Sequence, residues 1–420
     1  MSLLDHLITA ISHQQVSCLC LLDLSAAFDT IDHSILLHHL SSWFGITDSA
    51  LTWFKTYLTS RSFSVVASGF ASSSYPLSCG VPQGSVLGPI PFNMYTTPLS
   101  TLTSSRSLNH HLYADDTQIF ISFTPKTFTT AITQLQDTIS DISSWMTANV
   151  QSLNPSKTEF MLIGLPEKIS KISNPSLSLP SNHPITPTDS ACNLGFIFDS
   201  SLTFAKQISS LSSAYNYHIH DLRHIRHILD LKTAVVIATS LVHSKLDYYN
   251  SLYLNLPQEQ ISRLQLLQNS LARAVTLTPK TEHITPQLKS LHWLKIEERI
   301  HYKIISLTYD FLHTSQPNTS ENLSILNLLA PLVLPIISLY SAHPPPLLLK
   351  YLIYSYNQTA PILWNNLPKS MRTFSNTSPN SATTGQCSSL LLSLSKTQFR
   401  TLLKTFSASH THLNLLSFSD

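Results

Sequence analysis

Apolar positions follow two different periods along the first part of the chain. Short apolar runs bounded by polar or turn-forming residues are typical of strands in a sheet, and they occur at residues 18–22, 108–113, 117–123 and 157–163. Apolar residues recur every three to four positions over residues 34–44 and 127–150, which predicts amphipathic helices. We therefore expect an α+β unit in which a mostly antiparallel sheet is backed by helices.

The second part of the chain has a helical period. Segments 206–229, 232–248 and 258–276 carry apolar residues at helical spacing. Pro257 separates the last two segments, because proline stops a helix. From about residue 314 the sequence is rich in Pro, Ser, Asn and Leu, and we expect partly irregular structure there. The predicted domains are residues 1–200, 201–313 and 314–420.

An acidic pair interrupts two of the predicted strands. Residues 111–120 read HLYADDTQIF, so Asp115 and Asp116 stand at the tip of a predicted hairpin. Neighbouring carboxylates repel each other unless a cation lies close by, and Mg²⁺ is the cation that hard carboxylate oxygens suit. The alternative is an Asp-Asp turn exposed to water, because turns favour Asp.

A second carboxylate ends another predicted strand. The run Cys18–Leu22 leads directly into Asp23, so Asp23 and Asp115 could meet at one edge of a sheet. Two such carboxylates could hold two metal ions for in-line phosphoryl transfer. Between them lies GVPQGSVLGPIPF at residues 80–92, a loop whose glycines allow a ligand to approach the backbone before a helix begins.

These three stretches, taken together, resemble motifs A, B and C of reverse transcriptases. The matching segments are DLSAAFD at residues 23–29, GVPQGSVLGP at residues 80–89 and YADD at residues 113–116. Their order and spacing match as well as their residues, and they are most similar to those of non-LTR (LINE-type) retrotransposons. The resemblance implies a polymerase palm followed by an α-helical thumb, and an RNA-directed DNA polymerase that uses an RNA template, a DNA primer and dNTPs.

The resemblance also implies roles for the acidic residues. Asp23 and Asp115 would be the metal ligands for two Mg²⁺ ions, with Mn²⁺ as a substitute. Asp116 would matter for catalysis without binding the metal directly. Lys157, in the segment NPSKTE that resembles motif D, would protonate the leaving pyrophosphate as a general acid. The alternative for Lys157 is a solvated lysine that opens a strand.

Three further residues match positions that contact the nucleotide in this family. Phe28 would place a bulky ring beneath the sugar and exclude a ribose 2′-hydroxyl; its alternative role is a core aromatic. Gln83 and Gly84 would contact the incoming nucleotide and the template base, and their alternative is ordinary turn chemistry. Asp29 would support the site structurally.

The helical segments resemble the thumb of LINE-type enzymes. Residues 218–229 read HIHDLRHIRHIL, with Arg223 and Arg226 among four histidines. Histidines at helical spacing could bind a metal, but no carboxylate or cysteine recurs with them. A helix face near nucleic-acid phosphates is therefore the preferred interpretation.

Composition changes this picture little. Charged residues make up 11% of the chain, the net charge is +2 and the pI is about 8.2, so any nucleic acid would need a local basic groove. The five cysteines show neither zinc spacing nor a disulfide framework. We find no signal peptide, and Pro331 and Pro335 interrupt the apolar stretch 323–340, so we expect no membrane span. These features predict an intracellular protein of the nucleus or cytoplasm; its oligomeric state is left open.

The sequence also departs from the family pattern. Only 22 residues precede Asp23, whereas family members carry a fingers region and usually an endonuclease domain before motif A. Pro91 replaces an apolar helix-compatible residue. We therefore expect an N-terminally truncated enzyme that is weak or inactive alone. The alternatives are a non-catalytic nucleic-acid-binding remnant and a transposon relic without function.

Overall fold

The computed structural model describes residues 2–59, 61–82, 84–179, 184–254, 256–314, 356–372, 374–375, 391–392 and 395–409. The chain divides into two compact units. One is Gln14–Leu202; the other combines Met1–His13 with Thr203–Asp420. The first of these units holds all of the motif residues.

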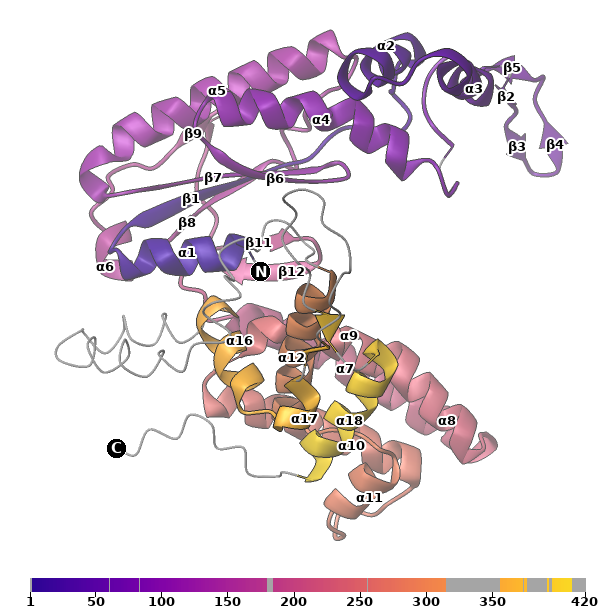
Figure 1. Cartoon of the computed structure of the whole chain (residues 1–420), viewed down its shortest axis with the longest axis vertical. Helices are drawn as coiled ribbons and strands as arrows, with labels where there is room; N and C mark the ends of the chain where they lie inside the picture. Colours follow the sequence, from indigo (N-terminus) through magenta and orange to yellow (C-terminus); the bar gives the residue numbers. More distant parts are fainter. Residues whose placement is uncertain are drawn as a thin grey trace. The chain divides into compact units, whose positions relative to one another are not determined.

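A four-stranded antiparallel sheet forms the centre of unit Gln14–Leu202 (Figure 1). The strand order is β6-β7-β1-β8, so the first strand of the chain lies in the middle of the sheet. The strands are β1 (Val16–Leu22), β6 (Asn109–Tyr113), β7 (Asp116–Phe123) and β8 (Glu159–Ile163). This arrangement confirms the predicted antiparallel sheet, although β8 starts two residues later than the sequence indicated, which leaves Lys157 in the preceding turn.

Two long helices, α4 (Pro89–Ser105) and α5 (Phe128–Ala148), cover one face of this sheet (Figure 1). Alternate residues of β1 point to that side because side chains in a strand alternate between faces. Cys18, Cys20 and Leu22 are thus buried in the core that these helices close. Burial raises the pKa of the Cys18 thiol to about 12, so both cysteines act as small apolar residues.

The helix α2 (His33–Phe44) begins and ends where the sequence predicts. The Asp32 carboxylate accepts hydrogen bonds from the backbone amides of Ser34 and Ile35, which satisfies donors that the first turn leaves unpaired. Gly45 follows the last turn in the left-handed conformation, with φ 63°. The next helix is α3 (Asp48–Leu58).

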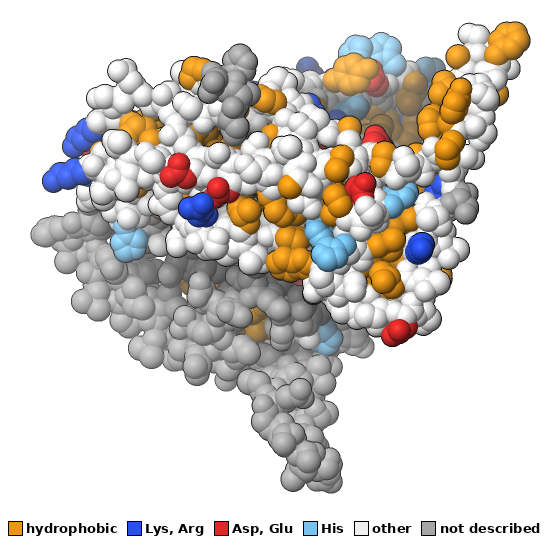
Figure 2. Space-filling view, turned by 90° about the horizontal axis from the view of Figure 1, so that it is seen from above, with side chains coloured by type: hydrophobic (Ala, Val, Ile, Leu, Met, Phe, Trp, Pro, Cys, Tyr) orange, Lys and Arg blue, Asp and Glu red, His pale blue; other side chains and the backbone are white. Residues whose placement is uncertain are grey.

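A narrow β-ribbon follows α3 (Figure 1). It pairs β2 (Ser62–Phe63) with β5 (Tyr75–Pro76) and β3 (Val66–Ala67) with β4 (Phe70–Ala71). Its apolar side chains are exposed, up to 82% for Phe70, and they appear at the right-hand end of the view in Figure 2.

Helix α4 contains prolines at two depths. Pro91 lies in its first turn, where the missing amide hydrogen costs nothing. Pro98 lies in its interior and is buried, although a proline there removes a backbone hydrogen bond. Tyr95, one turn earlier, is fully buried and donates its hydroxyl to the Asn149 carbonyl oxygen at 2.5 Å. Packing therefore holds this helix together despite its unfavourable sequence.

Smaller elements complete unit Gln14–Leu202. They are η1 (Pro125–Thr127), α6 (Pro166–Ile169), β9 (Leu177–Ser178), β10 (Pro184–Ile185), β11 (Ser190–Asn193) and β12 (Phe196–Asp199). The hairpin β11–β12 is joined to the sheet by a hydrogen bond of 2.7 Å that the side-chain amide of Gln118 donates to the side-chain oxygen of Asn193.

The other unit is helical. Its helices before residue 315 are α1 (Ser2–Ser12), α7 (Ala205–Ile225), η2 (Arg226–Ile228), α8 (Leu231–Ala238), the π-helical η3 (Thr239–His243), α9 (Ser244–Asp247), η4 (Asn250–Tyr253), α10 (Gln258–Thr276), α11 (Thr285–Ser290) and α12 (Ile296–Thr314). The predicted separation at Pro257 is confirmed, since that residue precedes α10 directly.

One expectation for this unit is wrong. Arg226 was predicted to lie on a helix face near phosphates, but its side chain is 7% exposed. Its Nε donates to the Val275 carbonyl oxygen at 2.7 Å and its Nη1 to that of Leu229 at 2.6 Å. This guanidinium therefore joins two helices by satisfying carbonyl groups at their ends.

The C-terminal part contributes further elements to the same unit. They are α16 (Tyr356–Asn365), α17 (Lys369–Arg372), β13 (Phe374–Ser375), β14 (Leu391–Leu392) and α18 (Lys396–Ser409). Phe399 of α18 stacks on Tyr309 at 4.2 Å and on Trp364 at 5.6 Å between ring centroids, so these helices share a core. The apolar stretch 323–340 lies outside the described residues. Among the helices that the structure describes, none is long and apolar enough to cross a membrane.

Candidate active site

The hairpin between β6 and β7 presents the acidic pair. Tyr113 pairs with Asp116 across the two strands, so Ala114 and Asp115 form the turn. Ala114 has φ 50°, a left-handed conformation that is unfavourable for a residue with a Cβ atom. The turn thus holds Asp115 at the end of the sheet next to Ala114, whose backbone conformation glycine would adopt more readily.

Strand pairing brings Asp23 to the same place. Leu22 of β1 pairs with Thr117 of β7, so the next residue along β1, Asp23, stands opposite Asp116 when the register is continued. Burial raises the pKa of the Asp116 carboxyl, the negative charges of Asp115 and Asp23 raise it further, and the positive charge of Lys157 opposes the rise. Four charged groups from three separate segments therefore share one electrostatic site.

A turn before β8 places Lys157 beside Asp23. The Asn154 amide donates to the Asp23 carbonyl oxygen at 2.9 Å, and Leu24 forms a β-bridge with Leu153. The Asn154 carbonyl oxygen in turn accepts from the Lys157 amide at 3.2 Å. The chain is thereby fixed so that Lys157 Nζ lies 3.1 Å from Asp23 Oδ2.

The contact between these two side chains is an ion pair without hydrogen-bond geometry. Asp23 Oδ2 is buried and accepts no well-directed hydrogen bond, even though the ammonium group is within ion-pair distance. The Lys157 side chain is 65% exposed and that of Asp23 only 20%, so solvent weakens the attraction. Asp23 therefore keeps a buried oxygen that a second cation could use.

The glycine-rich loop is tied to the segment that follows Asp23. The Gly80 amide donates to the Ile31 carbonyl oxygen at 2.7 Å, and the Val81 amide to that of Phe28 at 3.0 Å. Gly80 has φ 84°, and a Cβ atom there would lie 3.0 Å from the Asp29 carbonyl oxygen. Only glycine fits this close approach of two loops.

His33 is a positioning residue that the sequence did not reveal. Its Nε2 lies 2.8 Å from the Gly80 carbonyl oxygen, so the first residue of α2 fixes the start of the glycine-rich loop. A histidine next to the capping residue Asp32 was the available signal, but its partner is 47 positions away.

The rest of the loop is shaped by Ser85. Its hydroxyl donates to the Pro82 carbonyl oxygen at 2.7 Å and accepts from the Gly88 amide at 2.9 Å. Gly84 has φ 75° with open space around its Cα, so the backbone there is accessible to a ligand. Gln83 lies outside the described residues.

Phe28 is half-buried and stacks on Phe92 of α4. The ring centroids are 4.5 Å apart and the planes are inclined by 26°. This contact makes Phe28 part of the core, which is the alternative role that the sequence left open. Sugar selection by Phe28 stays a prediction.

The carboxylates suit a magnesium ion that water and substrate phosphates also bind, rather than one that protein ligands alone surround. Among the described residues, no three His, Cys, Asp or Glu side chains gather closely enough to hold a metal by themselves. Mg²⁺ is usually bound by one or two carboxylates together with water and substrate phosphates. The unsatisfied Asp23 oxygen and the mutual repulsion of the carboxylates both favour a divalent cation here.

Comparison with known proteins shows which proteins this chain is similar to. Residues 2–198 match the reverse transcriptase (RNA-dependent DNA polymerase) family. The RNA-directed DNA polymerase from mobile element jockey of Drosophila funebris is 26% identical over 293 residues, which cover 67% of this chain and 31% of that protein. The probable RNA-directed DNA polymerase from transposon BS of Drosophila melanogaster is 23% identical over 317 residues, which cover 71% and 33%.

The chain thus spans about a third of the length of these relatives. A telomerase from Candida albicans in complex with a fragment of telomeric RNA is 11% identical, covering 69% of this chain and 49% of that one. The TM-score of 0.34 is too low to support an argument. The ordered motifs, the antiparallel sheet that unites them and the match over residues 2–198 lead to one conclusion: residues 2–198 carry a reverse transcriptase domain, which is similar to the RNA-directed DNA polymerases of Drosophila mobile elements of the non-LTR (LINE) type.

Proposed function

We propose that this chain provides the catalytic palm of an RNA-directed DNA polymerase, which extends a DNA primer on an RNA template with dNTPs. The observation that carries the proposal is the meeting of Asp23 with the Asp115–Asp116 hairpin on neighbouring strands, with Lys157 Nζ 3.1 Å from Asp23. Carboxylates at strand ends next to an accessible glycine-rich loop suit nucleotidyl transfer, which depends on positioning and charge stabilisation.

Asp23 and Asp115 would hold two Mg²⁺ ions, which lower the cost of the developing charge on the attacking and leaving oxygens. Asp23 contributes its buried, unsatisfied oxygen, and Asp115 its position at the tip of the turn. Asp116, whose pKa burial and the charges of Asp115 and Asp23 raise, would add negative charge to the site without binding a metal directly. The sheet fixes the separation of these groups before substrate arrives.

Lys157 has a separate role as the general acid. Its ammonium group is exposed enough to reach a phosphate and is bound only weakly to Asp23. Because its attraction to Asp23 is weakened by solvent, the Lys157 ammonium group would be available to the leaving pyrophosphate. Proton donation of this kind contributes ~10²–10⁴-fold to a rate.

Nucleotide selection would depend on two loops that hydrogen bonds join, the glycine-rich loop and the segment that follows Asp23. The accessible backbone at Gly84, together with Gln83, contacts the incoming nucleotide, and the Phe28 ring occupies the space of a ribose 2′-hydroxyl. Because Gly80 joins the two loops, a change in one displaces the other.

Primer extension on an RNA template with dNTPs and Mg²⁺ tests the proposal. We would assay the chain as given and the chain joined to the upstream part of a jockey-type relative, each with Asp115→Asn beside it. Asp137→Asn is the matched control, because Asp137 is an exposed residue of α5. Template-directed synthesis that depends on Asp115 supports the function; synthesis in the joined chain that survives Asp115→Asn contradicts it.

A further inference from the structure

Helix α3 reaches the glycine-rich loop through one tyrosine side chain. The Tyr57 hydroxyl lies 3.3 Å from Ser85 Oγ, although the two residues are 28 positions apart. The structure describes every residue of α3, and only Leu58 among them is buried. This helix thus lies mostly at the surface of its unit, and Tyr57 connects it to the loop.

Tyr57 is the donor in this contact. The Ser85 hydroxyl has one hydrogen, which it donates to the Pro82 carbonyl oxygen at 2.7 Å. Its oxygen accepts from the Gly88 amide at 2.9 Å, which leaves one lone pair for the Tyr57 hydroxyl. Tyr57 therefore completes the hydrogen bonding of Ser85, with one bond donated and two accepted.

The loop closes tightly around the Ser85 side chain. A Cβ atom at Gly88 would lie 2.9 Å from the Pro82 carbonyl oxygen and 3.1 Å from Ser85 Oγ, so the loop has no room for a larger residue at that position. Gly84, directly before Ser85, has open space around its Cα. Because a planar peptide bond joins these two residues, a displacement of Ser85 would also move the accessible backbone at Gly84.

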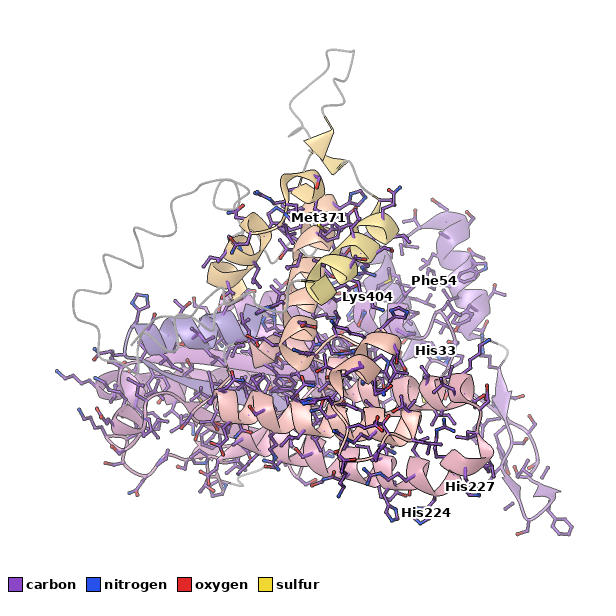
Figure 3. The ribbon with its side chains drawn as sticks, turned by 90° about the horizontal axis from the view of Figure 1, so that it is seen from below. His33, Phe54, His224, His227, Met371 and Lys404 are labelled. Carbon is purple, nitrogen blue, oxygen red and sulfur yellow. The ribbon has the colours of Figure 1, made fainter. Side chains whose placement is uncertain are left out.

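Two neighbours hold the Tyr57 ring in place. Trp53, four positions earlier, stacks on this ring with centroids 5.7 Å apart and planes inclined by 7°, and its own ring meets that of Phe54, which Figure 3 labels, edge-on at 5.2 Å. Arg61, four positions later, places its guanidinium carbon 4.5 Å from the Tyr57 ring centroid, and its Nε donates to the Tyr57 carbonyl oxygen at 2.6 Å. The Tyr57 hydroxyl is thereby held toward the loop.

From this geometry we propose that Tyr57 is a positioning residue for the incoming deoxynucleoside triphosphate. Tyr57 holds Ser85, and Ser85 holds the accessible backbone at Gly84. The proposal rests on the proposed function, which assigns nucleotide contact to this loop. A backbone that is fixed before its ligand arrives loses less conformational freedom on binding, so Tyr57 acts on nucleotide affinity rather than on the metal-assisted step.

Steady-state kinetics of the joined chain test this role, with dTTP on an oligoadenylate template and an oligothymidylate primer. Tyr57→Phe removes only the hydroxyl and keeps the ring. We expect the KM for dTTP to rise ~3–10-fold with kcat unchanged, which corresponds to the loss of one hydrogen bond. Tyr217→Phe, at an exposed tyrosine of α7, is the matched control and should behave like the parent chain. A lower kcat with an unchanged KM would overturn the proposal.

A double variant tests whether Tyr57 acts through Ser85. Ser85→Ala should raise the KM for dTTP at least as much as Tyr57→Phe does. The double variant should match Ser85→Ala alone, because the Tyr57 hydroxyl then has no acceptor in the loop to lose. Additive effects of the two substitutions would mean that Tyr57 acts by another route, and they would overturn the proposal.

Amide hydrogen exchange of the chain as given separates this proposal from the polymerase function. We expect faster exchange over residues 84–88 in Tyr57→Phe and unchanged exchange there in Tyr217→Phe. Unchanged exchange in Tyr57→Phe would overturn the proposal whether or not the joined chain makes DNA. Faster exchange together with synthesis that survives Asp115→Asn would keep the contact with the loop but overturn its role in nucleotide binding.

Discussion

The two units of this protein place charge in opposite ways. Unit Gln14–Leu202 gathers carboxylates at the ends of strands, where β1 and the β6–β7 hairpin meet. The helical unit gathers basic side chains around a pocket, namely Lys289, Lys295, Lys396, Arg400 and Lys404. In the first unit each charge is placed by backbone pairing within one sheet, and in the second by packing of helices that are far apart in sequence. The strand ends that carry the carboxylates can be recognised in the local sequence, whereas the packing of distant helices cannot.

The difference suggests that the two units respond differently to substitution. A change at a strand end of the first unit alters the charge of the acidic site, whereas a change in the core of the helical unit alters how its helices pack. Effects on catalysis and effects on stability should therefore be separable. The following predictions test that separation, beginning with the largest effect.

Loss of one metal-binding carboxylate should have the largest effect. Asp115→Asn or Asp23→Asn should reduce primer extension by ~10³-fold, because metal ions supply several kcal/mol to the transition state. Asp116→Asn should cost less, since we assign it no metal. Primer-extension rates of these variants in the joined chain, with Asp137→Asn as control, test whether Asp115 and Asp23 matter more than Asp116. Equal losses in Asp115→Asn and Asp116→Asn would contradict the assignment of the metal to Asp115 and not to Asp116.

The second-largest effect should be a loss of stability when a buried aromatic ring is removed from the helical unit. Phe399 is fully buried and stacks on Tyr309 and Trp364, so Phe399→Ala should lower the free energy of unfolding by ~3–5 kcal/mol. Urea unfolding measures this loss, with exposed Leu402→Ala on the same helix as control. A loss below ~1 kcal/mol would mean that α18 is not docked through this ring.

A smaller effect is expected at the nucleotide sugar. Phe28→Val should reduce discrimination against rNTPs by ~10-fold, because a few carbon atoms in an apolar pocket are worth ~1–3 kcal/mol. Phe28 also stacks on Phe92, so Phe92→Leu is the control for lost packing. The ratio of dNTP to rNTP incorporation tests whether Phe28 selects the sugar. If both variants change this ratio equally, Phe28 is a core residue only.

The smallest effect concerns the strained hairpin. Ala114→Gly should stabilise the chain by ~0.5–1 kcal/mol, because the left-handed backbone at φ 50° disfavours a Cβ atom. Ala50→Gly, on exposed helix α3, should destabilise by a similar amount. Thermal unfolding of both variants measures the sign of each change, and the same sign for both would remove the argument for backbone strain at Ala114.

The sequence predicted the parts that depend on local chemistry. The helix predicted over residues 34–44 forms as α2, and its caps Asp32 and Gly45 are local features because capping involves only neighbouring residues. The continuous apolar run of β1 led to Asp23 at the strand end, and the acidic pair lies at the tip of a hairpin as predicted, with Asp115 in the turn and Asp116 at the start of β7.

Features that depend on distant partners were missed or wrong. Arg226 looked like a phosphate ligand on its helix, yet Val275, 49 positions later, accepts its hydrogen bond. His33 and Gly80 are joined across 47 positions. The basic pocket brings Lys289 and Lys404 to one cavity, although neither segment shows an unusual charge pattern alone.

The most direct test of the central claim locates the metal on the chain. Fe²⁺ in place of Mg²⁺, with ascorbate and peroxide, generates hydroxyl radicals that cut the backbone near the bound ion. We expect cuts near residues 23 and 115 that excess Mg²⁺ suppresses, that disappear in both Asp23→Asn and Asp115→Asn, and that persist in Asp137→Asn. Cleavage that survives either of the first two substitutions, or that falls elsewhere in the chain, would contradict a metal site shared by these two carboxylates.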